Sequence, residues 1–302
     1  MKPRLLFHRE YHGYTGGHGK VFDYFEHALA AGWDARVYFT PGSVIDIGNP
    51  WWSHAQRIET AWRPTDADAL FLAGTDWTAI PLELEDTIPV VNLVQGFGHL
   101  EAHDPRFTAL RRSALRIAVS HPLAAALRAS GEVRGEIHCI PNGLRVSAVR
   151  PAKSVPLTVL AMKRPALGRE VARLLQIRGH RPWLVDRPLD RSTIHGLMAI
   201  SDVVVALPLE QEGFYLPALE AMAYGASVVT IDARGNMEYL DAGRNALVCE
   251  PEPEAMTHAI HTLCLSPSLR HRLRDAGLAT AERFDLAEER ARFHELLAKI
   301  PV

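Results

Sequence analysis

The chain has 302 residues, of which 47% are hydrophobic and 23% are charged. This is the composition of an ordinary globular protein, and the length suits two domains of about 150 residues each. The formal net charge is -2, from 35 acidic and 33 basic residues. A near-neutral chain lacks the overall positive field of a nucleic-acid-binding protein, which argues against nucleic-acid binding.

Cysteine usage and hydropathy indicate a cytoplasmic protein. Cys139, Cys249 and Cys264 are far apart and odd in number, which predicts reduced thiols rather than a disulfide framework or a zinc site. The N-terminal apolar run is too short for a signal peptide, and no stretch approaches the roughly 20 apolar residues of a membrane span.

The first half of the chain alternates short apolar segments with amphipathic ones, which predicts a parallel sheet covered on both faces. Ser120 is the expected N-cap of one helix, and Gly131 its end. The expected strands are 4–7, 34–39, 68–73, 88–94, 115–120 and a short one within 136–143, with helices at 21–31 and 121–130. The glycine-rich segment 8–20 is expected to be a loop.

A polar segment with two prolines, residues 145–156, is predicted to link two domains. The alternation then resumes, with strands at 157–162, 182–186, 202–208, 226–232 and 245–250, and helices at 169–179, 190–201, 217–224 and within 253–299. We therefore predict two Rossmann-like α/β domains, 1–148 and 149–302, that face each other across a cleft. The last helix is expected to pack back on the first domain.

The sequence "EGFYLPALEAMAYG", from Glu212 to Gly225, is the most distinctive stretch. Pro217 suits the first turn of a helix and Gly225 its C-terminal end, so a short helix follows a carboxylate and a glycine. A helix N-terminus at the carboxyl edge of a sheet binds phosphate, and Gly213 lets the backbone approach a ligand. Glu212 and Glu220 could then accept hydrogen bonds from hydroxyl groups on either side. An alternative is that Glu212 is a solvated loop acid and Glu220 caps its own helix.

This stretch resembles the donor-site signature E-G-F-x-L-P-x-L-E-A-M-A-x-G-x-P-V-V of glycosyltransferase family 4, whose members are retaining enzymes with the GT-B fold. Ser227 replaces the usual proline. The segments "ARGNMEYLDAGRNALV", "SDVVVALPLEQEGF", "IAVSHPLAAALR", "IHCIPNGL" and "TGGHGKVFDYFEHALAAGWDARVYF" are similar to other parts of the family and occur in the family's order.

The resemblance implies transfer of a sugar from a nucleotide sugar, with retention at the anomeric carbon and without an obligatory metal or cofactor. By position, Glu220 would bind the nucleotide ribose, and Glu212 would hold the donor sugar. The family's donor-binding backbone amides correspond to residues Gly213, Phe214, Tyr215 and Leu216.

The family places a basic pair after the first strand of the second domain, where it binds the leaving diphosphate. Arg164 and Arg169 match that spacing best, with Lys163 as an alternative that replaces the family's glycine. Arginine suits bidentate binding of a diphosphate. A solvated basic loop is the other interpretation. The second domain is shorter than is usual for the family between this loop and residues 182–186, so UDP-, GDP- and dTDP-sugars all stay open as donors.

In the first domain, the segment "NLVQGFGHLEAHD" is expected to bring His99 to the cleft edge, where the resemblance implies a contact with donor sugar or acceptor; a structural loop histidine is the alternative. Gly16 and Gly17 could let backbone amides approach the diphosphate, or form a plain turn. His8, His12 and His18 lack the further ligands of a convincing metal site. Trp51 and Trp52 could stack on an acceptor or pack in the core.

The predicted function is therefore a retaining, metal-independent glycosyltransferase. The alternatives are a nucleotide-sugar epimerase or hydrolase, or a non-catalytic sugar-nucleotide-binding protein on the same fold. The acceptor is expected to be a small molecule, a glycan or a lipid-linked molecule. Peripheral membrane association and the oligomeric state stay open.

Overall fold

The structure is a computed structural model that describes residues 2–84, 86–145 and 150–301. The chain forms two compact units. The first consists of residues 1–142 together with 287–302, and the second of residues 143–286. The predicted boundary between residues 148 and 149 lies outside the described residues. No helix within the described ranges is long and apolar enough to cross a membrane.

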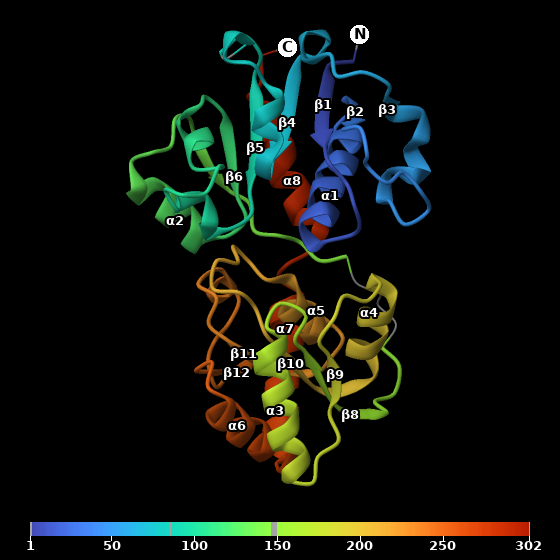
Figure 1. The fold of residues 1–302 in the computed structure, drawn as a ribbon, viewed down its shortest axis with the longest axis vertical. Helices are drawn as coiled ribbons and strands as arrows, with labels where there is room; N and C mark the ends of the chain where they lie inside the picture. Colours follow the sequence, from blue (N-terminus) through green and yellow to red (C-terminus); the bar gives the residue numbers. More distant parts are fainter. Residues whose placement is uncertain (1, 85, 146–149, 302) are drawn as a thin grey trace. The chain divides into compact units, whose positions relative to one another are not determined.

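The first unit is built on a seven-stranded parallel sheet of order β3-β2-β1-β4-β5-β6-β7 (Figure 1). Its core strands are rich in Val, Leu and Phe and are buried on both faces, as expected where helices cover both sides of a sheet. The strands are β1 (Arg4–Arg9), β2 (Asp34–Phe39), β3 (Ile58–Glu59), β4 (Ala69–Ala73), β5 (Val90–Val94), β6 (Leu115–Ala118) and β7 (Ile137–Cys139). The α-helices are α1 (Gly16–Ala30), α2 (His121–Ser130) and α8 (Leu286–Leu297).

The second unit is built on a five-stranded parallel sheet of order β12-β11-β10-β8-β9. Its strands are β8 (Val155–Leu160), β9 (Trp183–Val185), β10 (Ser201–Ala206), β11 (Ser227–Ile231) and β12 (Ala246–Cys249). Its helices are α3 (Pro165–Ile177), α4 (Arg191–Ile200), α5 (Leu216–Ala223), α6 (Pro253–Leu265) and α7 (Pro267–Ala281). Two parallel-sheet α/β units confirm the predicted fold class.

Local capping chemistry explains why α2 was predicted correctly at both ends. Ser120 accepts a hydrogen bond from the Leu123 amide at 3.3 Å, and Gly131 ends the helix in the left-handed conformation with φ 67°. A side chain would be strained at such a φ, whereas glycine adopts it freely.

Two expectations are corrected, and the two tryptophans whose role was left open are placed. Residues 16–20 form the first turn of α1 rather than part of a loop, because Thr15 caps the helix by accepting from the His18 amide at 3.2 Å. The predicted linker overlaps the start of β8, where Val155 pairs with Ser201. Trp51 is fully buried in the core, whereas Trp52 is 50% exposed.

A buried charge cluster holds α8 in the first unit. Glu289 on α8 forms an ion pair with Lys20 at 2.6 Å, and its other oxygen lies 3.1 Å from the ring of His27. Lys20 also pairs with Asp23 at 2.9 Å. These side chains are at most 9% exposed, and Phe293 on the same helix packs on the ring of Tyr24. The C-terminal helix thus completes the fold of the first unit.

The variant Glu289→Gln is expected to destabilise the first unit by about 3 kcal/mol, because the Lys20 ammonium then stays buried without one of its carboxylate partners. Urea unfolding followed by tryptophan fluorescence measures this change, since five of the six tryptophans lie in the first unit, namely Trp33, Trp51, Trp52, Trp62 and Trp77.

The matched control is Glu288→Gln, the preceding residue on α8, whose side chain is 59% exposed and pairs with Arg292. This substitution should change stability by less than about 0.5 kcal/mol. Equal losses for the two variants would contradict the role assigned to the buried cluster.

Candidate functional site

The sheet of the second unit has its strand-order reversal between β8 and β10. The chain continues from β8 to β9 on one side, whereas β10 lies on the other side of β8. In open parallel sheets, such a reversal leaves a crevice at the carboxyl ends of the strands, where ligands bind. The two segments that leave these strands are residues 161–164 and 207–215.

Two cations lie in this region. Lys163 forms an ion pair with Glu212, so the loop after β8 contacts the loop after β10. Arg164 precedes α3, and its Nε donates to the carbonyl of Pro208 at 2.7 Å. Among the described residues, the two terminal amino groups of Arg164 have no hydrogen-bond partner, which leaves this guanidinium able to bind an anion.

The loop that carries Glu212 is held by close backbone packing. A Cβ atom on Gly235 would lie 2.1 Å from the carbonyl carbon of Gly213, so only glycine fits at position 235. Phe214 is buried and packs against the rings of Tyr239 and Phe284, with centroids 5.3 and 5.6 Å away. The loop is therefore fixed before any ligand arrives.

Tyr215 sets the start of α5. Its backbone is left-handed, with φ 58° and ψ 75°, a conformation that a tyrosine rarely adopts. The Tyr239 hydroxyl donates to the Tyr215 carbonyl at 2.7 Å and holds it in this state. Tyr215 immediately precedes Leu216, the first residue of α5. The amides of the first helical turn, which have no partner within the helix, therefore lie at the end of the Glu212 loop.

Glu220 lies on α5 and is only 8% exposed. Its Oε1 is 3.3 Å from His195 Nε2 and 3.6 Å from the guanidinium of Arg191, both on α4. The other ring nitrogen of His195 lies 3.0 Å from the Tyr224 hydroxyl. Glu220 is thus oriented by a polar cluster and does not cap its own helix through its side chain.

Arg191 and His195 were not predicted as site residues from the sequence. They are four residues apart, so they share one face of α4, and this spacing of two basic residues was the available signal. It could not be interpreted before the structure placed α4 against α5.

Arg169 contacts a different part of the unit. Its Nε donates to Asp186 Oδ2 at 2.6 Å, just beyond the end of β9, and its side chain is 63% exposed. The hydrogen bond from Arg169 lowers the pKa of the Asp186 carboxyl. The contacts of Arg164 and Arg169 therefore lie at the ends of β10 and β9, on opposite sides of β8.

The candidate residues of the first unit are placed as follows. His99 is 3% exposed, and burial, with a further contribution from Arg106, lowers its pKa to about 3, so its ring is neutral at physiological pH. Gly17 lies in the first turn of α1, where its carbonyl accepts from Gln95 Nε2 at 3.2 Å. Gly16 is the first residue of that helix.

Potential metal ligands do not gather in the described part of the chain. Across residues 2–84, 86–145 and 150–301, no group of three or more His, Cys, Asp or Glu side chains could hold a metal ion. His8 and His18 instead contact Asp76 and Arg9 respectively, and His12 contacts Glu10. Cys139, Cys249 and Cys264 are thiols that form no disulfide with one another.

Comparisons with known proteins address the family and the fold. Residues 183–279 match the sequence model of the family described as Glycosyl transferases group 1. No curated protein matches the chain.

The chain is similar to the solved structure of sucrose-phosphate synthase from Thermosynechococcus elongatus, with a TM-score of 0.75 and 15% identity, covering 99% of each chain. It is similar to Anabaena HepE in complex with UDP and glucose, with a TM-score of 0.72 and 17% identity, covering 98% of this chain and 99% of that one. It is also similar to a trehalose-phosphate synthase (UDP-forming) from Burkholderia vietnamiensis, with a TM-score of 0.66 and 12% identity, covering 99% and 100%.

The predicted resemblance is thus confirmed at the level of fold and of the matched segment. The chain has the GT-B fold, and its residues 183–279 match the family described as Glycosyl transferases group 1.

Proposed function

We propose that the protein is a retaining glycosyltransferase that transfers a sugar from a nucleotide-sugar donor to an acceptor. The observation that carries the proposal is the convergence of Lys163, Arg164 and the Glu212–Leu216 loop at the strand-order reversal of the second unit. This arrangement offers two cations, free helix amides and a carboxylate in one crevice. This combination suits a sugar joined to a diphosphate, because cations and helix amides bind the diphosphate and the carboxylate accepts hydrogen bonds from the sugar.

In this proposal, the diphosphate is bound by Lys163, Arg164 and the backbone amides at the start of α5. Because negative charge develops on the departing nucleotide, fixed positive charge stabilises the transition state. These side chains supply that charge, so we propose that the reaction requires no metal. Binding involves an exchange of partners, in which Lys163 leaves Glu212 for the diphosphate and Glu212 accepts from hydroxyl groups of the donor sugar.

In this proposal, Glu220 binds the nucleoside. Its carboxylate is held by His195 and Arg191, and a buried, oriented acceptor suits the two hydroxyl groups of a ribose. The similarity to HepE, solved with UDP and with UDP-glucose, favours a uridine diphosphate sugar among the UDP-, GDP- and dTDP-sugars.

The test is to incubate the protein with UDP-, GDP- and dTDP-sugars and to follow nucleotide release with and without candidate acceptors. Chelator should leave the rate unchanged, and proton NMR should report the donor's anomeric configuration in the product. Conversion of the donor without any acceptor would instead support the epimerase or hydrolase. Binding without turnover across a broad acceptor panel would support the non-catalytic alternative.

The variant Glu220→Ala should weaken donor binding about 10- to 100-fold, because hydrogen bonds to a charged acceptor contribute about 1.5–3 kcal/mol. Isothermal titration with UDP and with UDP-sugar measures the change. Glu254→Ala, at an exposed position in the first turn of α6, is the control and should bind like the parent. Unchanged affinity in Glu220→Ala would refute the ribose assignment.

The variant Glu212→Ala should separate nucleotide binding from transfer. Affinity for UDP should stay within about threefold of the parent, because Lys163 remains to bind the diphosphate. The rate of transfer should fall about 100-fold, because the sugar is no longer held in position. The control is Glu210→Ala, an exposed residue of the same loop. Equal loss of UDP affinity and rate would show that Glu212 does not act on the sugar.

A further inference from the structure

The first unit contains a cavity of about 500 Å³ at its own strand-order reversal. In its sheet, β1 is flanked by β2 on one side and β4 on the other, so the reversal lies between β1 and β4. The cavity is lined by the segment that follows β1, by the start of α1 and by the segment that follows β4. Its size and position are those of a small-molecule site.

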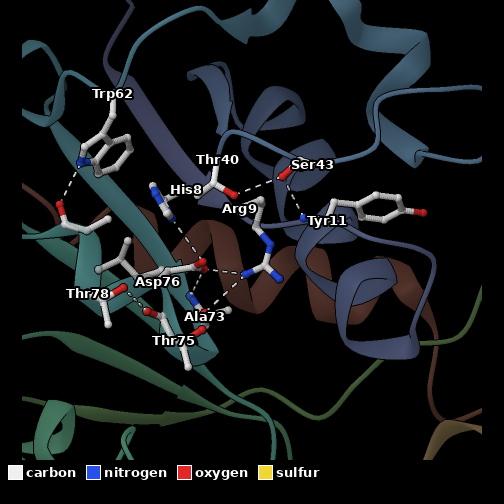
Figure 2. Close-up of polar contacts among 12 residues, drawn as sticks. His8, Arg9, Tyr11, Thr40, Ser43, Trp62, Ala73, Thr75, Asp76 and Thr78 are labelled. Carbon is white, nitrogen blue, oxygen red and sulfur yellow. Dashed lines mark hydrogen bonds and ion pairs between the residues drawn. The ribbon is translucent and has the colours of Figure 1, made fainter.

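An internal ion pair forms the polar centre of this cavity (Figure 2). Arg9, at the end of β1, donates through Nη1 to Asp76 Oδ2 at 2.5 Å. Asp76 also accepts from the Ala73 amide at 2.9 Å, and its other oxygen lies 3.3 Å from His8 Nδ1. Arg9 and Asp76 are both buried, with 9% and 5% of the whole residue exposed. The positive charge of Arg9 is therefore matched by a fixed carboxylate.

His18, on the first turn of α1, is held in a neutral and defined state. Arg9 Nη2 donates to His18 Nδ1 at 3.0 Å, which leaves the ring proton on Nε2. Burial, and next the charge of Arg9, lower the pKa of His18 to about 4. At neutral pH, His18 therefore contributes a hydrogen-bond donor to the cavity without a positive charge.

The remaining wall adds further carboxylate and hydroxyl groups. Glu10 lines the cavity and contacts His12 at 2.9 Å. The Tyr14 ring lies over α1, where a Cβ on Gly19 would be 2.2 Å from the tyrosine hydroxyl oxygen, so Gly19 makes room for this wall. The hydroxyl-bearing residues of the lining are Tyr14, Thr15 and Thr75.

The charge balance of the lining decides what it can bind. Arg9 is paired with Asp76, and Glu10 adds a second carboxylate to the lining, so no uncompensated arginine is left for a phosphate. Carboxylates, hydroxyl groups and a neutral imidazole instead suit a ligand rich in hydroxyl groups. We propose that this cavity binds the acceptor, that the acceptor is a neutral saccharide, and that Asp76 excludes phosphorylated sugars by neutralising Arg9. The assignment of the ligand as an acceptor rests on the proposed function.

The test is binding at His18, read from histidine side-chain resonances by NMR and assigned with the His18→Gln variant. The probes are methyl α-glucoside, fructose and maltose, compared with glucose 6-phosphate and inorganic phosphate. We expect at least one neutral sugar to shift the His18 resonances and to bind at least about tenfold more tightly than glucose 6-phosphate. Tighter binding of a phosphate, or no shift with any neutral sugar, would overturn the proposal.

The variant Asp76→Asn should invert this preference, because Arg9 then carries an uncompensated charge, and affinity for glucose 6-phosphate should rise at least about tenfold. Glu10→Gln, at an exposed position that keeps the fold, should raise the ratio of affinity for glucose 6-phosphate to affinity for the neutral sugar, but by a smaller factor. The matched control is Glu136→Gln, whose side chain is also about two-thirds exposed and which should leave the ratio unchanged. An unchanged ratio in Glu10→Gln would contradict the proposal even if Asp76→Asn fails to fold.

Donor binding is measured on the same samples with UDP and UDP-sugar, through residues of the second unit. Failure of every neutral sugar to bind while UDP-sugar binds and turns over would refute only the acceptor inference. Failure of every nucleotide sugar to bind would refute the proposed function, and the His18 measurement would still decide whether the cavity takes neutral saccharides.

Discussion

Parallel pairing of the strands is the constraint on which the rest of this structure depends. When all strands of a sheet run in one direction, every segment that follows a strand emerges at the same edge. Both sheets here also reverse their order once, between β1 and β4 in the first unit and between β8 and β10 in the second. The polar residues that follow these four strands are therefore gathered at two crevices, although they are up to 67 positions apart in the sequence, as Arg9 and Asp76 are.

In each crevice, a cation is already paired with a carboxylate of the same unit. Lys163 contacts Glu212 in one, and Arg9 contacts Asp76 in the other. The two pairs differ in exposure, because the side chains of Lys163 and Glu212 are 44% and 18% exposed, whereas those of Arg9 and Asp76 are 11% and 6% exposed. An exposed pair exchanges partners readily, and a buried pair does so only at a large cost. The Lys163–Glu212 pair thus suits a site that binds an anion. The Arg9–Asp76 pair instead suits a rigid part of a cavity lining, in which the two charges cancel.

The loop that carries Glu212 owes its rigidity to residues about 20 to 70 positions later. Gly235 packs against the Gly213 backbone, Tyr239 holds the carbonyl of Tyr215, and Phe284 packs on Phe214. The left-handed backbone of Tyr215 persists because these contacts determine it. Groups fixed in this way lose little freedom when a ligand binds, which is the physical basis of preorganisation.

The sequence by itself determined the alternation of strands and helices, the two-unit α/β class and the Glu212–Gly225 motif, because hydrophobic periodicity and capping residues are local signals. Ser120 and Gly131 fix α2 in this way. Local signals did not reveal Thr15 as an N-cap. Its bond with the His18 amide starts α1 at Gly16, inside the segment that was expected to be a loop. Tertiary structure alone decided that Arg191 and His195 orient Glu220, that Arg169 pairs with Asp186, and that Asp76 neutralises Arg9. The physical reason is that partner choice between charges depends on distance through space, which the strand order sets and local sequence does not.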